Sequence, residues 1–201
     1  MAISVNATVV DLRNDQPKPE DVFLVDSNVW YWVGYSNASL SDNYNQSVDY
    51  PTYVNNAVNN GSSLYRCNLS FAELAHSIER SQRNIFNKLL RPKDFRHTYP
   101  NERQIVATEI ENVWNLVDAI TAGNAIETNL TDSFIAQSLS RLKSEALDGY
   151  DAFMVEAMLS MNIVQVITDD SDFGQVAGIT VFTAHERLIK QAASQGKLQR
   201  R

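Results

Sequence analysis

The fold of this chain is decided near its N-terminus by the stretch Val22-Phe23-Leu24-Val25-Asp26-Ser27-Asn28. Four apolar residues run without alternation from Val22 to Val25 and then meet an acid, Asp26. An unbroken apolar run rich in branched side chains is typical of a strand covered on both faces, as in a parallel sheet. Ligands bind such sheets just beyond the carboxyl ends of the strands. Asp26 and Asn28 are therefore placed where a site forms, although one acid at a strand end is equally typical of a helix cap.

Strand-like and helix-like patterns alternate along the rest of the chain. Further strands are expected at residues 63–69, 125–129, 163–168 and 179–182. Helices are expected at residues 51–60, 70–90, 102–122, 133–146, 148–161 and 185–193. Strands that alternate with helices favour a mostly parallel sheet with helices on both faces. The sequence therefore predicts an α/β domain of three layers, α/β/α, with a central mostly parallel sheet.

One domain is expected, over residues 22–193. Residues 1–21 are weakly patterned and are interpreted as an N-terminal extension, and residues 194–201 as a basic C-terminal tail. Two insertions are expected within the domain: a polar loop at 36–47 and a helical segment at 92–123. A loop with two prolines is expected at 91–100, where it overlaps the start of the helical segment. At 201 residues the chain is long enough to bury a core.

Composition limits the function classes. The single cysteine, Cys67, excludes an intramolecular disulfide framework. No apolar run approaches the length of a membrane span, and no signal-peptide layout is present, so a cytoplasmic location with no membrane partner is expected. The net charge of −7 argues against a surface coated in basic residues for nonspecific nucleic-acid binding. One local exception is the basic segment between Arg80 and Arg103.

Further acids are expected to converge on Asp26. Glu73 lies in the first turn of the helix after the second strand, and Asp151 in the first turn of a later helix. A third group follows the strand at 163–168 and contains Asp169, Asp170 and Asp172. Carboxylates gathered beyond one sheet edge repel each other strongly unless a cation lies between them. Such an all-oxygen set is suited to Mg²⁺ or Mn²⁺.

Each acid also has a structural interpretation. The pattern Ser70-Phe-Ala-Glu73 is typical of a capping box, Asp148-Gly-Tyr-Asp151 is typical of a helix start, and the acids after residue 168 suit a polar turn. Four acidic positions at element ends on the same side of one sheet are nevertheless hard to explain as unrelated caps. Their conjunction favours a metal site.

The ordered set of motifs resembles that of PIN-domain nucleases, a family that includes the toxin ribonucleases of bacterial toxin–antitoxin pairs. The resemblance extends over residues 23–182. It rests on Val25-Asp-Ser-Asn28, Leu69-Ser-Phe-Ala-Glu-Leu74, Gly149-Tyr-Asp-Ala-Phe-Met-Val-Glu-Ala157 and Val166-Ile-Thr-Asp-Asp-Ser-Asp-Phe173. Any one of these motifs is weak, whereas the ordered set is fairly specific.

The resemblance implies residue roles. It implies a catalytic quartet of Asp26, Glu73, Asp151 and Asp170. It implies metal ligands at Asp26, Asp151, Asp170 and Asp172, with Asn28 and Thr168 orienting the site. Asp169 ranks below Asp170, because the family tolerates varied residues at that position.

The resemblance also implies an activity: a nuclease dependent on Mg²⁺ or Mn²⁺, specifically an endoribonuclease acting on single-stranded RNA. The toxin of a toxin–antitoxin pair is a narrower expectation, with a small antitoxin and a second copy of the chain as expected protein partners. The basic residues expected to hold RNA are Arg80, Arg83, Arg91, Lys93 and Arg96. A solvated helix face is the alternative for most of them.

Two other functions remain open at this point. One is a catalytically inactive PIN-like fold used for binding. The other is a phosphatase with an aspartyl nucleophile, chemistry that usually has a second acid two residues after the nucleophile, where this chain has Asn28.

Overall fold

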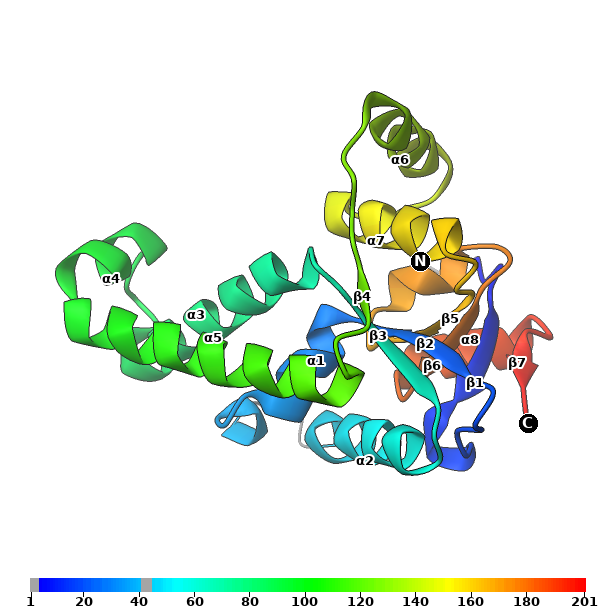
Figure 1. The fold of residues 1–201 in the computed structure, drawn as a ribbon, viewed down its shortest axis with the longest axis horizontal. Helices are drawn as coiled ribbons and strands as arrows, with labels where there is room; N and C mark the ends of the chain where they lie inside the picture. Colours follow the sequence, from blue (N-terminus) through cyan, green and yellow to red (C-terminus); the bar gives the residue numbers. More distant parts are fainter. Residues whose placement is uncertain (1–3, 41–44) are drawn as a thin grey trace.

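A parallel sheet organises the computed structural model, which describes residues 4–40 and 45–201 (Figure 1). Within these residues, seven strands form it in the order β4-β3-β2-β5-β6-β1-β7, and every pairing is parallel. The strands are β1 (Thr8–Asp11), β2 (Val22–Val25), β3 (Ser63–Cys67), β4 (Ala125–Ile126), β5 (Gln165–Ile167), β6 (Thr180–Thr183) and β7 (Leu198–Gln199). The strand that Asp26 directly follows, β2, lies near the middle of this order, between β3 and β5.

Helices cover both faces of the sheet, so the expected three-layer α/β/α architecture is confirmed. They are α1 (Ser27–Gly34), α2 (Gln46–Asn59), α3 (Ser70–Asn87), α4 (Pro92–Thr98), α5 (Pro100–Thr121), α6 (Asp132–Ser144), α7 (Gly149–Ser160) and α8 (Glu186–Ser194). Short 3₁₀ turns lie at Leu12–Asn14, Ala38–Leu40 and Ser171–Gln175. Buried residues of α1, α2, α3 and α5 pack on one face, and those of α7 and α8 pack on the other.

The apolar run of β2 is covered on both sides, as its sequence predicts. Leu24 belongs to the core beneath α7 and α8, whereas Phe23 and Val25 belong to the core beneath α1 and α2. All three side chains are fully buried. Successive residues of a strand point to opposite faces, so an unbroken apolar run is what a strand between two helical layers requires.

The two ends of the chain are part of the sheet. Residues 1–21 were expected to precede the domain, yet β1 within them pairs with β6. Similarly, β7 lies in the expected basic tail and pairs with β1. Both strands are too short to produce a clear periodic signal, because β1 has only Val9 and Val10 as buried apolar residues. Their place in the sheet comes from tertiary pairing.

Two segments expected to be loops contain helix. Residues 92–98 form α4, and Pro92 and Pro100 occupy the first turns of α4 and α5. Proline suits that position because its missing N–H would have no partner there. The segment 92–123 is therefore helical almost throughout, and the expectation of a loop at 91–100 is wrong for residues 92–98. In the expected loop at 36–47, residues 38–40 form a 3₁₀ turn and α2 begins at Gln46, while residues 41–44 lie outside the described residues.

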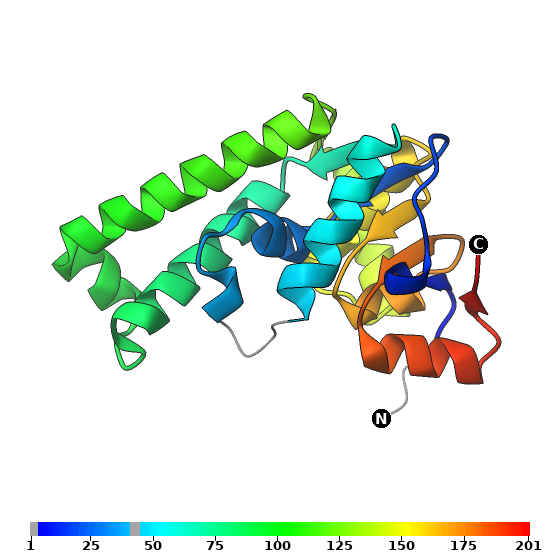
Figure 2. The same ribbon diagram turned by 90° about the horizontal axis from the view of Figure 1, so that it is seen from below.

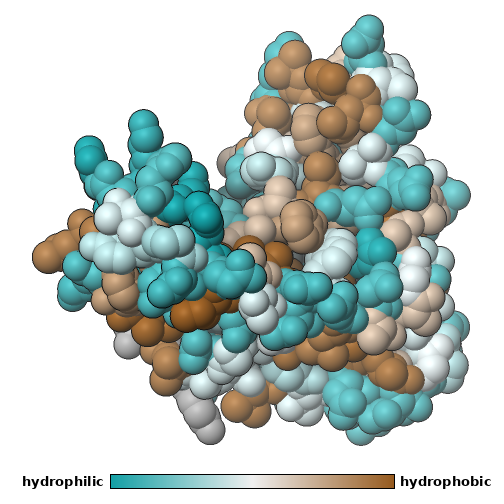
Figure 3. Space-filling view, turned by 60° about the vertical axis from the view of Figure 1, so that its left-hand side comes forward, coloured by the Kyte–Doolittle hydropathy of each residue, from teal (hydrophilic) through white to brown (hydrophobic). Residues whose placement is uncertain are grey.

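Two projections flank the carboxyl edge of the sheet. Helices α3, α4 and α5 extend away from the sheet as an arm, with α4 at its outer end (Figure 1). Seen from below, α5 runs alongside α3 in this arm, and α2 lies beside α1 (Figure 2). Helix α6 packs on α7 and stands above the sheet. The space-filling view shows the surface indented between the arm and the α6 projection (Figure 3).

The described part of the chain contains no candidate for a membrane-spanning helix. None of its helices is both long and apolar enough to cross a bilayer.

Candidate metal centre

Asp26 acts as a helix cap and also anchors a polar network. It follows β2 directly, and its Oδ1 accepts a hydrogen bond of 2.6 Å from the Ser27 amide at the start of α1. Its Oδ2 accepts hydrogen bonds of 2.6 Å from both Thr168 Oγ1 and Asn28 Nδ2. The side chain is almost completely buried. The cap and the site are thus two uses of one carboxylate.

Thr168 and Asn28 join the ends of two neighbouring strands. Thr168 follows β5, and its Oγ1 accepts a 2.9 Å hydrogen bond from the Asp170 amide. Asn28 Oδ1 accepts a 3.1 Å hydrogen bond from the Asp169 amide. These contacts hold the start of the acidic turn against Asp26. Both residues therefore contact Asp26 and the acidic turn, and their role in orienting a site stays a prediction.

A compact group of carboxylates forms where α3 and α7 begin. One ligand oxygen from each of Glu73, Asp148 and Asp151 lies within 4.8 Å of the others. Asp151 is buried, Glu73 is half-buried and Asp148 is exposed. Asp148 caps α7, because its Oδ1 accepts hydrogen bonds from the amides of Tyr150 (2.8 Å) and Asp151 (3.0 Å). An ion at this position would be held by the first turns of two helices.

Asp148 was not among the expected ligands. The signal was present in the sequence as an acid three residues before Asp151, but a helix cap explained it fully. The structure shows that this cap directs an acid to the same place as Glu73 and Asp151.

Glu73 does not serve as the reciprocal half of a capping box. The N-cap of α3 is Leu69, and no side chain caps this helix end. The Ser70 hydroxyl contacts Met154 Sδ at 3.6 Å instead. Glu73 Oε2 is buried and has no hydrogen-bond partner in the described part of the chain. A buried carboxylate oxygen without a partner is costly, so this atom is open to a ligand.

Burial and mutual repulsion raise the pKa values of three of these acids. Removal from water is the largest cause in each case, because it disfavours the charged form. The pKa of Asp26 rises to about 6, with repulsion from Asp170 adding to the effect of burial. The pKa of Glu73 rises to about 7 and that of Asp151 to about 9, and Asp26 is the strongest repelling neighbour of both. Without a cation, this centre is therefore short of positive charge.

The residues fit a hard divalent cation. The donor atoms are all carboxylate oxygens, the group repels itself, and one buried oxygen lacks a partner. Mg²⁺ and Mn²⁺ prefer such oxygen ligands, and a bound ion would remove the repulsion.

Two acids in the turn after β5, Asp170 and Asp172, lie outside the three-acid group. Asp170 Oδ1 accepts a 2.8 Å hydrogen bond from the Asp172 amide, so the polar-turn interpretation also describes this segment. Asp170 lies close enough to raise the pKa of Asp26 and Asp151. Burial and Asp170 raise the pKa of Asp172. The compact three-acid group includes neither of these residues, nor Asp26. Asp170 is close enough to Asp151, and Asp172 close enough to Asp148, for electrostatic repulsion.

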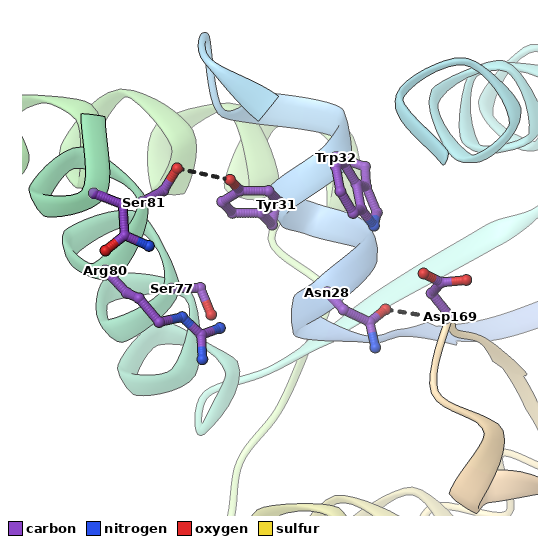
Figure 4. Close-up of a pocket in the computed structure, with 8 residues that line it drawn as sticks. Asn28, Tyr31, Trp32, Ser77, Arg80, Ser81 and Asp169 are labelled. Atoms are coloured by element: carbon purple, nitrogen blue, oxygen red, sulfur yellow. Dashed lines mark hydrogen bonds between the residues drawn. The ribbon is translucent and has the colours of Figure 1, made fainter. Parts of the chain in front are cut away.

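A cleft of about 360 Å³ lies beside the carboxylates, between α1 and α3 (Figure 4). It borders the metal centre through Asn28, which contacts Asp26, and it also contains Asp169. Its lining residues are Asn28, Tyr31, Trp32, Ser77, Arg80, Ser81, Asn84 and Asp169.

The basic residues expected to hold RNA are dispersed. Arg80 lines the cleft beside the metal centre. Arg83 donates a 2.6 Å hydrogen bond to the Leu90 carbonyl, which closes the end of α3. Arg91 pairs with an acid, Asp94, at 2.6 Å, Arg96 pairs with Glu79 at 2.7 Å, and Lys93 is exposed on α4. Of the five, Arg80 is therefore the one that the structure places at the cleft.

We expect the metal-free protein to lose stability as the pH rises from 5 to 9. Asp26, Glu73 and Asp151 have folded-state pKa values above their unfolded values, so the native state binds more protons in this range and stability falls with pH. Thermal unfolding in chelator at pH 5, 7 and 9 measures the effect. Mn²⁺ should remove most of the decline. A melting temperature that is flat or rises over this range in chelator would contradict the raised pKa values of these acids.

Comparison with known proteins leaves the family open. No family model matches the chain, and no similar curated protein was found. Among solved structures, the crystal structure of VapBC2 from Rickettsia felis bound to a DNA fragment from their promoter is similar to this chain. The match has 10% sequence identity and a TM-score of 0.45, and it covers 81% of this chain and 98% of that chain. At this level of identity the candidate metal centre has to be interpreted from its own geometry.

Proposed function

We propose that this protein is a PIN-like nuclease that hydrolyses phosphodiester bonds with Mg²⁺ or Mn²⁺. The observation that carries the proposal is the group of Glu73, Asp148 and Asp151, whose carboxylate oxygens lie within 4.8 Å of one another at the carboxyl edge of a parallel sheet. Ligands bind α/β sheets at this edge. The raised pKa of Asp151 and the unpartnered oxygen of Glu73 support a centre that is completed by a cation.

When bound, a divalent ion supplies an activated water and neutralises charge on the scissile phosphate. The residues of the chain would hold this ion and orient the groups around it. Glu73 and Asp151 come from the first turns of α3 and α7, and Asp148 joins them from the cap of α7. Asp26 adds negative charge beside them, and its orientation is fixed by Asn28 and Thr168. The catalytic quartet of Asp26, Glu73, Asp151 and Asp170 thus remains part of the proposal, with Asp148 added to the metal ligands.

The proposed substrate is single-stranded RNA, cleaved internally. An acidic centre requires some positive charge nearby to attract a polyanion, and Arg80 supplies it in the adjoining cleft. The other expected RNA-binding residues lie on or near the α3–α5 arm. Arg83, Arg91 and Arg96 bond to groups of the chain there, so a contact with more distant phosphates would have to replace these bonds.

A protein partner is also part of the proposal, either a small antitoxin or a second copy of the chain. Large apolar side chains on and just before α6 are exposed, which supports a contact surface there (Figure 3). They are Leu130, Ile135, Leu139 and Leu142. Light scattering of the purified protein tests the homodimer.

The proposed activity is tested by incubating the protein with fluorescently labelled single-stranded RNA, single-stranded DNA and a phosphomonoester, each with Mn²⁺ or chelator. We expect internal cleavage of RNA in Mn²⁺ and none in chelator. Phosphomonoester hydrolysis without RNA cleavage would favour the aspartyl-nucleophile phosphatase. RNA binding without cleavage in either condition would favour the inactive binding fold. Either of these results contradicts the proposal.

A further inference from the structure

The cleft beside the metal centre is a continuation of it along α3. Glu73, a proposed metal ligand, is followed on the same helix by Ser77, Arg80, Ser81 and Asn84. These are spaced at i+4, i+7, i+8 and i+11, so they share one helical face. Arg80 lies about 10 Å along the helix axis from Glu73. A strand with its scissile phosphate at the metal centre would therefore place its neighbouring nucleotide, rather than the scissile phosphate itself, at Arg80.

The opposite wall of the cleft is aromatic and fixed. It comes from α1, where Tyr31 and Trp32 line the cleft (Figure 4). The Tyr31 hydroxyl donates a 3.1 Å hydrogen bond to Ser81 Oγ, which ties this wall to α3. The two rings lie 5.1 Å apart at 84°, edge to face. Both rings line the cleft, and aromatic surface is what a nucleobase stacks on.

Asp169 adds a carboxylate to the lining of the cleft, and Tyr50, which does not line the cleft, holds it in place. The Tyr50 hydroxyl donates a 2.8 Å hydrogen bond to Asp169 Oδ1, and the Asp169 amide is bound by Asn28. Tyr50 is itself buried and also accepts a hydrogen bond from the Ala184 amide. With Oδ1 engaged in this way, Oδ2 is the oxygen that remains to accept a hydrogen bond from a ligand N–H group.

We propose that this cleft is a nucleotide subsite that binds the residue of the substrate strand next to the scissile bond and sets base preference there. Its base lies against Trp32, an N–H group on the base edge donates to Asp169, and Arg80 binds the phosphate. The volume of about 360 Å³ falls in the usual range for small-ligand sites, about 300–1,000 Å³. This inference rests on the proposed nuclease function for the identity of the ligand as part of a strand.

The subsite is tested without metal, so that the result does not depend on catalysis. The binding of the four nucleoside 5′-monophosphates and of the matching nucleosides is measured by calorimetry in chelator. We expect the wild type to bind nucleotides with a preference among bases. Trp32→Leu should weaken the binding of nucleotides and of nucleosides alike, by about tenfold, because stacking is lost. Arg80→Gln should weaken the binding of nucleotides but leave the binding of nucleosides unchanged, because only the phosphate contact is lost.

Asp169→Asn gives a readout that a purely structural role would not produce. Asparagine keeps an oxygen for the Tyr50 hydroxyl but replaces the free acceptor with a donor. We expect the order of base preference to change, both for mononucleotides and at the position next to the cleavage site in RNA oligonucleotides. Lys190→Gln on α8 removes a positive charge outside the cleft and should leave binding as in the wild type.

The outcomes separate the subsite from the proposed function. Selective nucleotide binding that responds to these variants, but without RNA cleavage, supports the subsite and contradicts the nuclease. Metal-dependent cleavage without nucleotide binding to the cleft, or with binding that Trp32→Leu, Arg80→Gln and Asp169→Asn leave unchanged, overturns the subsite and leaves the nuclease standing.

Discussion

Substitution of Asp151 by asparagine is expected to lower RNA cleavage in Mn²⁺ by a factor on the order of 10³ or more. Asp151 is the most deeply buried member of the three-acid group, and it faces Asp26, Asp148, Asp170 and Glu73 as neighbouring negative charges. A neutral amide removes a charged ligand and weakens electrostatic stabilisation worth several kcal/mol. Each 1.36 kcal/mol corresponds to a tenfold change in rate. The measurement is the initial rate of cleavage at saturating RNA.

The same substitution is expected to stabilise the metal-free fold. Asparagine preserves the shape of the side chain and removes one of several mutually repelling acids, so the free energy of unfolding in chelator should rise by about 1 kcal/mol or more. For a domain of this size that is roughly 2–4 °C in melting temperature. Loss of activity together with a gain in stability is characteristic of a functional charge cluster and is not expected of a structural acid.

Glu111→Gln is the matched control, because it removes one negative charge from the exposed face of α5. It should change neither the rate nor the melting temperature by much. If Asp151→Asn instead destabilises the protein by several kcal/mol, as loss of a buried hydrogen-bonded charge does, the acid is structural and the proposal of a metal centre is contradicted. Parallel assays of Asp148→Asn and Asp172→Asn compare the acid at the cap of α7 with the acid in the turn after β5 as metal ligands.

Replacement of Arg201 by methionine is expected to destabilise the fold by about 3–5 kcal/mol, the usual cost of leaving buried charges without their partner. The guanidinium makes two hydrogen bonds with Asp15 (2.8 and 3.1 Å) and two with Asp21 (2.7 and 2.9 Å). It also lies over the Phe182 ring, 4.5 Å from its centroid. The Asp15 and Asp21 side chains are only 2% and 4% exposed, so neither can be solvated when the arginine is removed. Urea-induced unfolding measures the loss.

Arg200→Met is a close control, because the neighbouring arginine is exposed. It should cost less than about 0.5 kcal/mol, the usual range for surface substitutions. The triple variant in which Asp15→Asn and Asp21→Asn accompany Arg201→Met should recover part of the stability, since it removes the unpaired charges. Equal effects of the two arginine substitutions would contradict the buried clamp. RNA cleavage at low temperature should survive, because the clamp does not line the metal centre or the cleft.

Some properties of this protein were determined by local sequence alone. The apolar run at Val22–Val25 predicts a strand between two helical layers, and the structure confirms it, because an unbroken run has no face to give to water. The alternation of strands and helices predicts the parallel sheet, because a helix between two strands returns the chain to lie parallel to the first strand. The acids at Asp26, Glu73 and Asp151 lie at element ends in the sequence, which predicts that they lie at one edge of the sheet. In the structure Glu73 and Asp151 share a compact group, and Asp26 is close enough to raise the pKa of both.

Other properties were decided only by the tertiary structure. The sequence does not show that Asp148 lies within 4.8 Å of Glu73 and Asp151 while Asp170 and Asp172 stay outside that group, because the distance depends on how α3 and α7 approach each other. The cleft likewise requires α1 and α3, separated by some forty residues, to stand side by side. The edge strands β1 and β7 and the Arg201 clamp have no periodic signal, since their stability comes from partners more than 150 residues away. Local pattern determines which elements form and where their ends point, whereas distances between side chains depend on long-range packing.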